Sequence, residues 1–211
     1  MDRENSWRII EQQRRAIAGL LADLTPAEWE TPSLCADWRV REVAAHIAVT
    51  PDPPSPADLL RTMVRARGDY NRMIDDLTVR HARRPTAELV RQIRDNAASR
   101  RLPKLTNYRN ILFDTIVHGQ DIAIPLGRII EVDPRAAAAG ADTAAASGWP
   151  VWDRHRLDGI RLSATDIDWT HGSGSEIRGP ILALLLLVTG RTAALDRVAG
   201  EGIPRLARQL A

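Results

Sequence analysis

The chain has 211 residues, 44% of them hydrophobic and 27% charged, which is the composition of a globular protein rather than a disordered or fibrous one. Its formal net charge is only +2, and Lys104 is the only lysine among 29 basic residues. The arginines are scattered among acidic residues and only 4% of the chain is aromatic. Neither a basic stripe nor a stacking platform is present, so we expect no nucleic-acid partner.

Cys35 is the only cysteine, which excludes a disulfide within the chain and favours a reducing compartment. The first residues lack the basic start and apolar core of a signal peptide. The longest apolar run, Ile181–Val188, is far shorter than the roughly 18 residues that span a bilayer. We therefore expect a cytoplasmic protein that does not contact a membrane.

The first 125 residues are predicted to form helices joined by short connections. Ser6 is expected to cap a first helix whose apolar residues lie between 10 and 24, with Arg14 and Arg15 turned outward. A second, short helix is indicated by Thr25-Pro26-Ala27-Glu28, the pattern of a capping box with proline at the first helical position.

The next helices follow from apolar spacing and from proline. Asp37 is expected to cap a helix whose apolar stripe occupies residues 40–47, and the prolines of 51–56 force a connection. One long helix is predicted over 57–79 and a further piece over 86–99. The last main helix begins near residue 107 and ends near 125. Together these helices predict a mainly α, up-and-down four-helix bundle.

After residue 127 the pattern changes. An alanine-rich helix is predicted over 133–147, and alternating residues at 160–164, continued by 167–169, indicate a strand. A turn at 171–175 and a return strand near 177 complete a β-hairpin. Ile181–Val188 is predicted to be a buried helix stopped by Gly190. We expect two units: a helical bundle over 1–150, and a small α+β segment over 151–211 packed on it.

Three polar residues on predicted helices could bind a metal ion. Asp114 and His118 are four residues apart on the last bundle helix and therefore share a face, and His46 lies beside the apolar stripe of an earlier helix. Two imidazoles and one carboxylate would leave coordination positions open, as catalytic zinc sites do. Asp121, one turn further, could accept an imidazole N–H and fix its tautomer.

Simpler interpretations remain for each of these residues. A histidine on an apolar face is commonly a core residue with one hydrogen bond, and Asp114 with His118 could be an ordinary helix-surface pair. Cys35 could be a nucleophile, but nothing near it in the sequence lowers its pKa, which favours a small buried hydrophobe.

Two stretches together resemble the mycothiol-dependent maleylpyruvate isomerase family, part of the DinB-like superfamily of metal-binding four-helix bundles. Residues 31–46 read TPSLCADWRVREVAAH and residues 114–127 read DTIVHGQDIAIPLG. Shorter segments near the C-terminus, including Thr189-Gly190-Arg191, are similar to many members. The resemblance extends loosely over the whole chain.

The resemblance implies a DinB-like bundle in which His46, Asp114 and His118 bind a divalent metal, zinc or alternatively nickel. The isomerase that names the family has glutamate where this chain has Asp114, a shorter side chain that puts affinity and metal identity in question. It also implies that the metal activates mycothiol as a thiolate.

The resemblance therefore implies a mycothiol-dependent isomerase or S-transferase that acts on a small electrophile. The alternative is a non-catalytic metal- or ligand-binding (regulatory) module with the same fold. A third interpretation is a helical structural protein in which both histidines merely pack. A homodimer is expected only as the commonest oligomeric state.

Overall fold

The computed structural model describes residues 1–51, 55–102, 106–147 and 154–210. Its helices are α1 (Arg3–Ala22), α2 (Pro26–Trp29), α3 (Val40–Val49), α4 (Pro56–Arg65), α5 (Tyr70–His81), α6 (Thr86–Asp95), α7 (Tyr108–Ala123), α8 (Pro134–Ala146), α9 (Ile181–Val188) and α10 (Ile203–Leu210), with short 3-10 helices η1 (Arg154–Leu157) and η2 (Thr192–Arg197). Strands β1 (Ile160–Ala164), β2 (Thr170–Gly172) and β3 (Ser175–Gly179) form one small sheet. The predicted fold class, mainly α with a C-terminal α+β segment, is confirmed. In the described part of the chain no helix is both long and apolar enough to cross a membrane.

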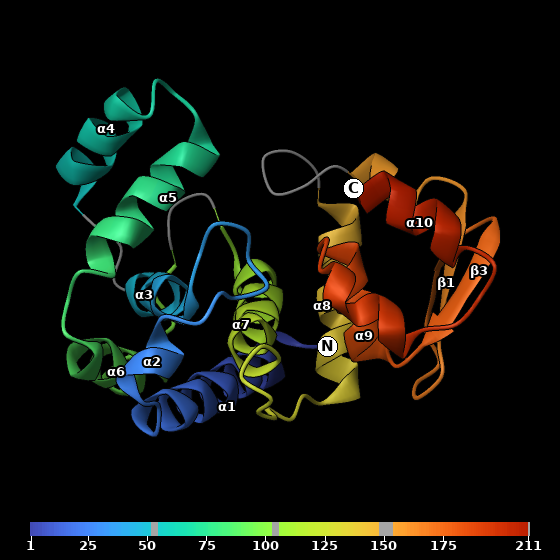
Figure 1. Cartoon of the computed structure of the whole chain (residues 1–211), viewed down its shortest axis with the longest axis horizontal. Helices are drawn as coiled ribbons and strands as arrows, with labels where there is room; N and C mark the ends of the chain where they lie inside the picture. The colour runs from blue at the N-terminus through green and yellow to red at the C-terminus, as the bar shows by residue number, and fades with distance from the viewer. Residues whose placement is uncertain (52–54, 103–105, 148–153, 211) are drawn as a thin grey trace.

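Helices α1, α3, α6 and α7 pack into a bundle, with α2 beside them (Figure 1). The bundle core is made of buried apolar side chains, which include Ile17, Val43, Leu89, Ile93 and Ile122. The stripe predicted on α3 is buried, as is nearly all of α7 after its first turn. Because most of α7 is covered by its neighbours, the polar side chains of His118, Gln120 and Asp121 face other protein atoms rather than bulk water.

The start and the facing of α1 differ from the prediction. Asp2, not Ser6, caps the helix by accepting a hydrogen bond from the Asn5 N–H at 2.8 Å. Arg14, expected to point outward, is 1% exposed and donates to the carbonyls of Asn96, Ala97 and Ser99. The carbonyls that end α6 need donors, and a long guanidinium can reach them from inside the core.

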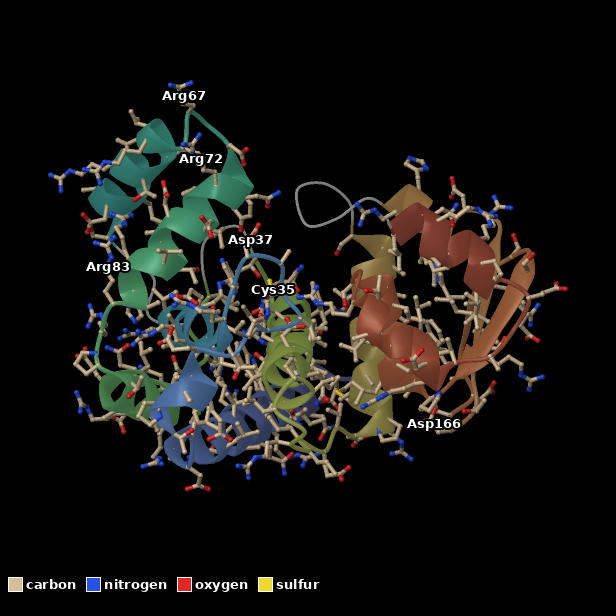
Figure 2. The ribbon with its side chains drawn as sticks, viewed as in Figure 1. Cys35, Asp37, Arg67, Arg72, Arg83 and Asp166 are labelled. Carbon is tan, nitrogen blue, oxygen red and sulfur yellow. The ribbon has the colours of Figure 1, made fainter. Side chains whose placement is uncertain are left out.

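The long helix predicted over 57–79 is wrong: it is two helices, α4 and α5. They are separated by Arg67 and Gly68, whose φ angles are 55° and 81°. Two successive left-handed residues end a right-handed helix, and glycine is the residue that adopts this conformation without strain. Figure 2 shows Arg67 at the tip of the resulting helical hairpin.

The cap predicted for α3 is also wrong, because Asp37 has φ 65° and lies in a turn before the helix. Arg39 occupies the cap position, and its backbone N–H is accepted by the Glu42 side chain at 3.0 Å. By contrast, the capping box predicted at Thr25 and Glu28 is confirmed.

The sheet has the order β2-β1-β3. The predicted hairpin between 160–169 and the return strand near 177 is wrong: β1 pairs antiparallel with β2, whose residues 170–172 include part of the predicted turn, and residues 167–169 lie outside the strands. The predicted return strand, β3, pairs parallel to β1 on its other side. The chain passes between these edges through Ser173 and Gly174, and Gly174 lies against Gly159, the residue before β1.

A second hydrophobic cluster joins the sheet to the helices. Its buried members include Phe113 of α7, Ala141 of α8, Leu162 of β1 and Leu184 of α9. Helix α8 packs against both α7 and α9, so it lies between the bundle and the C-terminal elements (Figure 1). The boundary predicted at residue 150 lies outside the described residues, and the division into two units stays a prediction.

Candidate metal centre

The structure brings the three predicted metal-binding residues together. His46 lies in the last turn of α3, and Asp114 and His118 lie on successive turns of α7. His46 Nε2 is 3.6 Å from Asp114 Oδ1, and His118 Nε2 is 3.4 Å from the same oxygen. The ring centroids of the two histidines are 4.8 Å apart. All three ligand atoms lie within 4.8 Å of one another, although the helices that carry them are far apart in the sequence.

Asp121 contacts the other side of His118. Its Oδ2 is 2.9 Å from His118 Nδ1, and its side chain is fully buried. Arg191 donates to the same carboxylate twice, from Nε to Oδ1 at 3.0 Å and from Nη2 to Oδ2 at 2.7 Å. The predicted contact between Asp121 and an imidazole therefore exists, and a cation that the sequence analysis did not assign holds the carboxylate.

The loop between α2 and α3 forms one wall of the centre. The ring of Trp38 lies 5.4 Å from that of His46 and 6.1 Å from that of His118. Its indole N–H donates to Asp75 Oδ1 on α5 at 2.8 Å, which ties this wall to the helical hairpin. Cys35 and Asp37 lie in the same loop, near the upper end of α7 in the view of Figure 2.

The charges of the centre shift its pKa values strongly. Burial alone would raise the pKa of Asp114, but His118 and His46 outweigh it and hold that pKa well below its usual range. Burial alone would lower the pKa of His118, yet Asp114 and Asp121 raise it to about 9. Asp114 is therefore an anion at neutral pH, and His118 in the metal-free protein carries a proton between two carboxylates.

Cys35 is close to His118 and Asp121, so these three also form a group of ligand types. However, burial raises the pKa of the Cys35 thiol to about 11. A thiol that stays protonated at neutral pH is a poor nucleophile. Cys35 is half-buried, and its raised pKa favours a packing role over that of a nucleophile.

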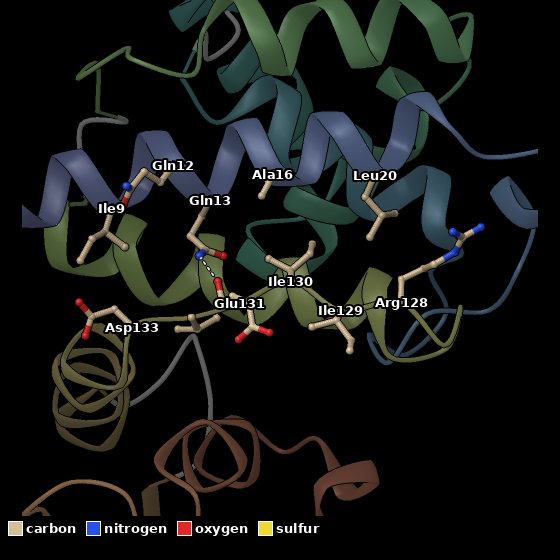
Figure 3. A pocket seen from close by; sticks show the side chains of 11 residues that line it. Ile9, Gln12, Gln13, Ala16, Leu20, Arg128, Ile129, Ile130, Glu131 and Asp133 are labelled. Atoms are coloured by element: carbon tan, nitrogen blue, oxygen red, sulfur yellow. Dashed lines mark hydrogen bonds between the residues drawn. The ribbon is translucent and has the colours of Figure 1, made fainter.

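A separate groove lies between α1 and residues 128–133 (Figure 3). Gln13 donates from Nε2 to the Glu131 carbonyl across it at 2.7 Å, and Ile129 at its edge is 81% exposed. None of the residues that line this groove belongs to the metal centre.

Sequence reasoning missed Trp38 and Arg191 as parts of the centre. Both lie in the segments that carried the family resemblance, which was the only signal that could have pointed to them. Their contacts cross between elements, so no helical or strand spacing predicts them.

The sequence model of the mycothiol maleylpyruvate isomerase N-terminal domain matches residues 10–107. The match covers 98 of the 211 residues, just under half of the chain. The resemblance recognised in the sequence is thereby confirmed. The matched segment contains His46 and ends at Asn107, the residue that caps α7. Asp114, His118, Asp121 and Arg191 all lie beyond it.

Solved structures show the same fold over nearly the whole chain. The crystal structure of the mycothiol-dependent maleylpyruvate isomerase matches with a TM-score of 0.59 and 14% identity, covering 95% of this chain and 93% of that one. A point mutant of the same enzyme gives the same values. No curated protein matches this chain significantly in sequence. At this identity the structural likeness establishes the fold alone.

Proposed function

We propose that this protein is a divalent-metal-binding, thiol-dependent enzyme that acts on a small electrophile, either as an isomerase or as an S-transferase. The observation that carries this proposal is the convergence of His46, Asp114 and His118 from two helices onto one point. The domain family of residues 10–107 supports mycothiol as the thiol.

The donor set fits a metal ion. Ligand atoms bound about 2.0–2.1 Å from a tetrahedral ion lie roughly 3.3 Å apart, which is close to the 3.6 and 3.4 Å between Asp114 Oδ1 and the two imidazole nitrogens. Two imidazoles and a carboxylate suit zinc, with nickel as the alternative. The shorter side chain of Asp114 still lies within 3.6 Å of both imidazole nitrogens, which supports a site built on aspartate.

A bound divalent cation would lower the pKa of a coordinating thiol, so that the thiol is nucleophilic at neutral pH. The protein's own residues prepare the centre for this. Asp121 holds the proton on His118 Nδ1, which leaves Nε2 to face His46 and Asp114. Trp38 covers the two imidazoles on one side and limits the access of water. Addition of the thiol to a double bond, rotation and elimination would give isomerisation; retention of the thioether would give transfer.

Elemental mass spectrometry of the untagged protein, with His46→Ala and His118→Ala, tests the metal centre. We expect about one divalent ion per chain in the wild type and loss of at least nine-tenths of it in both variants, because each removes one of three donors. His155→Ala, which removes a 72% exposed histidine, should keep the metal. Equal metal content in all variants, or none in zinc-treated wild type, would overturn the proposal.

Turnover separates the enzyme from a non-catalytic binding module. The metal-loaded protein should consume mycothiol or isomerise maleylpyruvate, or act on another small electrophile in a panel, and His118→Ala should not. Stoichiometric metal without turnover of any member of the panel would favour the binding module.

A further inference from the structure

Arg191 reaches the metal centre from outside the bundle. It follows α9, whose end is a turn at Gly190 with φ 84°, closed by the Gly190 N–H on the Leu187 carbonyl and the Arg191 N–H on the Leu186 carbonyl. This glycine-terminated helix end directs the Arg191 side chain toward α7. Nη1 donates to the Thr189 carbonyl at 2.7 Å, which anchors the guanidinium at its own helix end.

The Arg191 guanidinium forms a bidentate pair with the Asp121 carboxylate through two hydrogen bonds. Nε and Nη2 each donate to a different carboxylate oxygen, so the plane of the carboxylate is fixed by the plane of the guanidinium. Asp121 is fully buried and Arg191 is 16% exposed, so little water competes for these bonds. Only an arginine fork holds a carboxylate in this way, because lysine offers a single charged point.

Asp121, held by Arg191, in turn orients the imidazole of His118 through their hydrogen bond. Both oxygens of Asp121 accept from the Arg191 guanidinium, at 3.0 and 2.7 Å, so the carboxylate is paired as an anion with this cation. An ionised carboxylate can only accept, and therefore His118 Nδ1 must donate across the 2.9 Å contact. A proton on Nδ1 leaves Nε2 as the atom available to a cation. His46 has no such support, because its Nδ1 is buried without a partner among the described residues.

We propose that Arg191 is a positioning residue that acts through Asp121 to fix the Nδ1–H form of His118, so that a C-terminal residue completes the metal centre of the bundle. This inference rests on the proposed function, since it takes His118 as a ligand. Without Arg191, the buried carboxylate loses two of its donors and is free to turn away from the imidazole.

Arg191→Gln and Arg191→Lys test this link by two measurements. The first is the chemical shift and exchange rate of the His118 Nδ1 proton in ¹⁵N-histidine-labelled protein, with and without zinc. We expect a downfield, slowly exchanging proton in the wild type and a proton that exchanges at least tenfold faster in Arg191→Gln. The second is zinc affinity by competition with a chelator, which should fall about 10- to 100-fold in Arg191→Gln and less in Arg191→Lys.

Arg178→Gln, which removes a 62% exposed arginine on β3, is the matched control and should behave as wild type in both measurements. If Arg191→Gln does not fold by circular dichroism, Arg191→Lys carries the test, because it keeps the buried charge. An unchanged His118 proton or an unchanged zinc affinity in the folded variant would overturn the inference. The proton is measured in metal-free protein as well, so a wild type that binds no zinc would defeat the proposed function while leaving the Arg191 link to be judged separately.

Discussion

At the scale of single residues, the ion pair between Arg39 and Glu42 stabilises the helix that carries His46. Glu42 accepts from the Arg39 Nη2 at 2.7 Å, its Nε at 3.0 Å and its backbone N–H at 3.0 Å. Burial alone would raise the pKa of Glu42, but these bonds outweigh it and lower that pKa. The folded protein therefore holds a carboxylate here that the unfolded chain protonates more readily.

The sign of this shift predicts a pH dependence of stability. Because the folded pKa of Glu42 is lowered, its contribution is complete above the unfolded pKa of about 4.3 and is lost as the pH falls through the lower folded value. Glu42→Gln should lower Tm at pH 7 by about 2–4 °C, the shift that roughly 1 kcal/mol produces in a chain of this size.

The difference in Tm between Glu42→Gln and wild type should become steadily smaller as the pH falls below 4. Circular dichroism during heating measures both values. Glu11→Gln, which removes an exposed helix pair with Arg15, should change Tm by less than about 1 °C at either pH. A gap for Glu42→Gln that stays constant from pH 7 to pH 3 would show that its charge does not stabilise the fold.

At the scale of elements, the crossing between β2 and β3 depends on a glycine. Gly174 has φ 118°, and a Cβ added there would lie 2.2 Å from the Gly159 carbonyl oxygen. The Ser175 N–H donates to that same oxygen at 3.0 Å, so the two segments cannot separate without breaking the bond. Side chains other than hydrogen are therefore excluded at this position.

Gly174→Ala should destabilise the protein by about 2 kcal/mol or more, through strained backbone and a steric clash. Gly19→Ala is the matched control, because Gly19 lies exposed inside α1 with nothing within 4 Å of an added Cβ. It should stabilise the protein by about 0.5–1 kcal/mol. Chemical denaturation of both variants gives the two values. Equal free energies of unfolding for Gly174→Ala and Gly19→Ala would contradict the steric clash at Gly174.

The same elements show what the sequence could predict. The limits of α7 and α8 were predicted within a few residues, because Asn107 and the Asp133-Pro134 pair mark helix starts through local hydrogen bonds. The break between α4 and α5 was missed, since a continuous apolar spacing outweighed one glycine in the prediction. The parallel pairing of β3 was missed because strand direction depends on where the chain crosses in space.

The residues of the metal centre also divide into those that the sequence predicted and those that it did not. Helical spacing placed Asp114, His118 and Asp121 on one side of α7, and the apolar stripe placed His46 inward. Arg191 contacts Asp121 across 70 residues of sequence, and Arg14 contacts Ser99 across 85. Contacts at such separations leave no periodic pattern in a single sequence, so Arg14 was predicted to point outward and Arg191 was given no role.

At the scale of the whole molecule, two long helices belong to both hydrophobic clusters. α1 contributes Ile10 to the cluster around the sheet and Ile17 to the bundle cluster, and α7 contributes Ile116 and Ile122 in the same way. Because each helix is a continuous hydrogen-bonded unit, unfolding one cluster removes a wall of the other. We therefore expect a single unfolding transition.

Differential scanning calorimetry of wild type, Leu89→Ala and Leu184→Ala tests this expectation. Leu89 belongs to the bundle cluster and Leu184 to the cluster around the sheet, and both are fully buried. Each variant should lower the Tm of the same single transition, because each substitution reduces the free energy of unfolding by about 2–5 kcal/mol. Two resolved peaks, with each variant shifting only one, would show that the two clusters unfold independently.

The pairing of Arg191 with Asp121 also bears on how the protein is made. A ribosome synthesises Arg191 70 residues after Asp121, so a nascent bundle that folded early would bury this carboxylate with His118 but without its guanidinium partner. Removing one partner of a buried pair costs about 3–5 kcal/mol. We therefore expect this side of α7 to stay open to water until Arg191 has been synthesised and can close the centre.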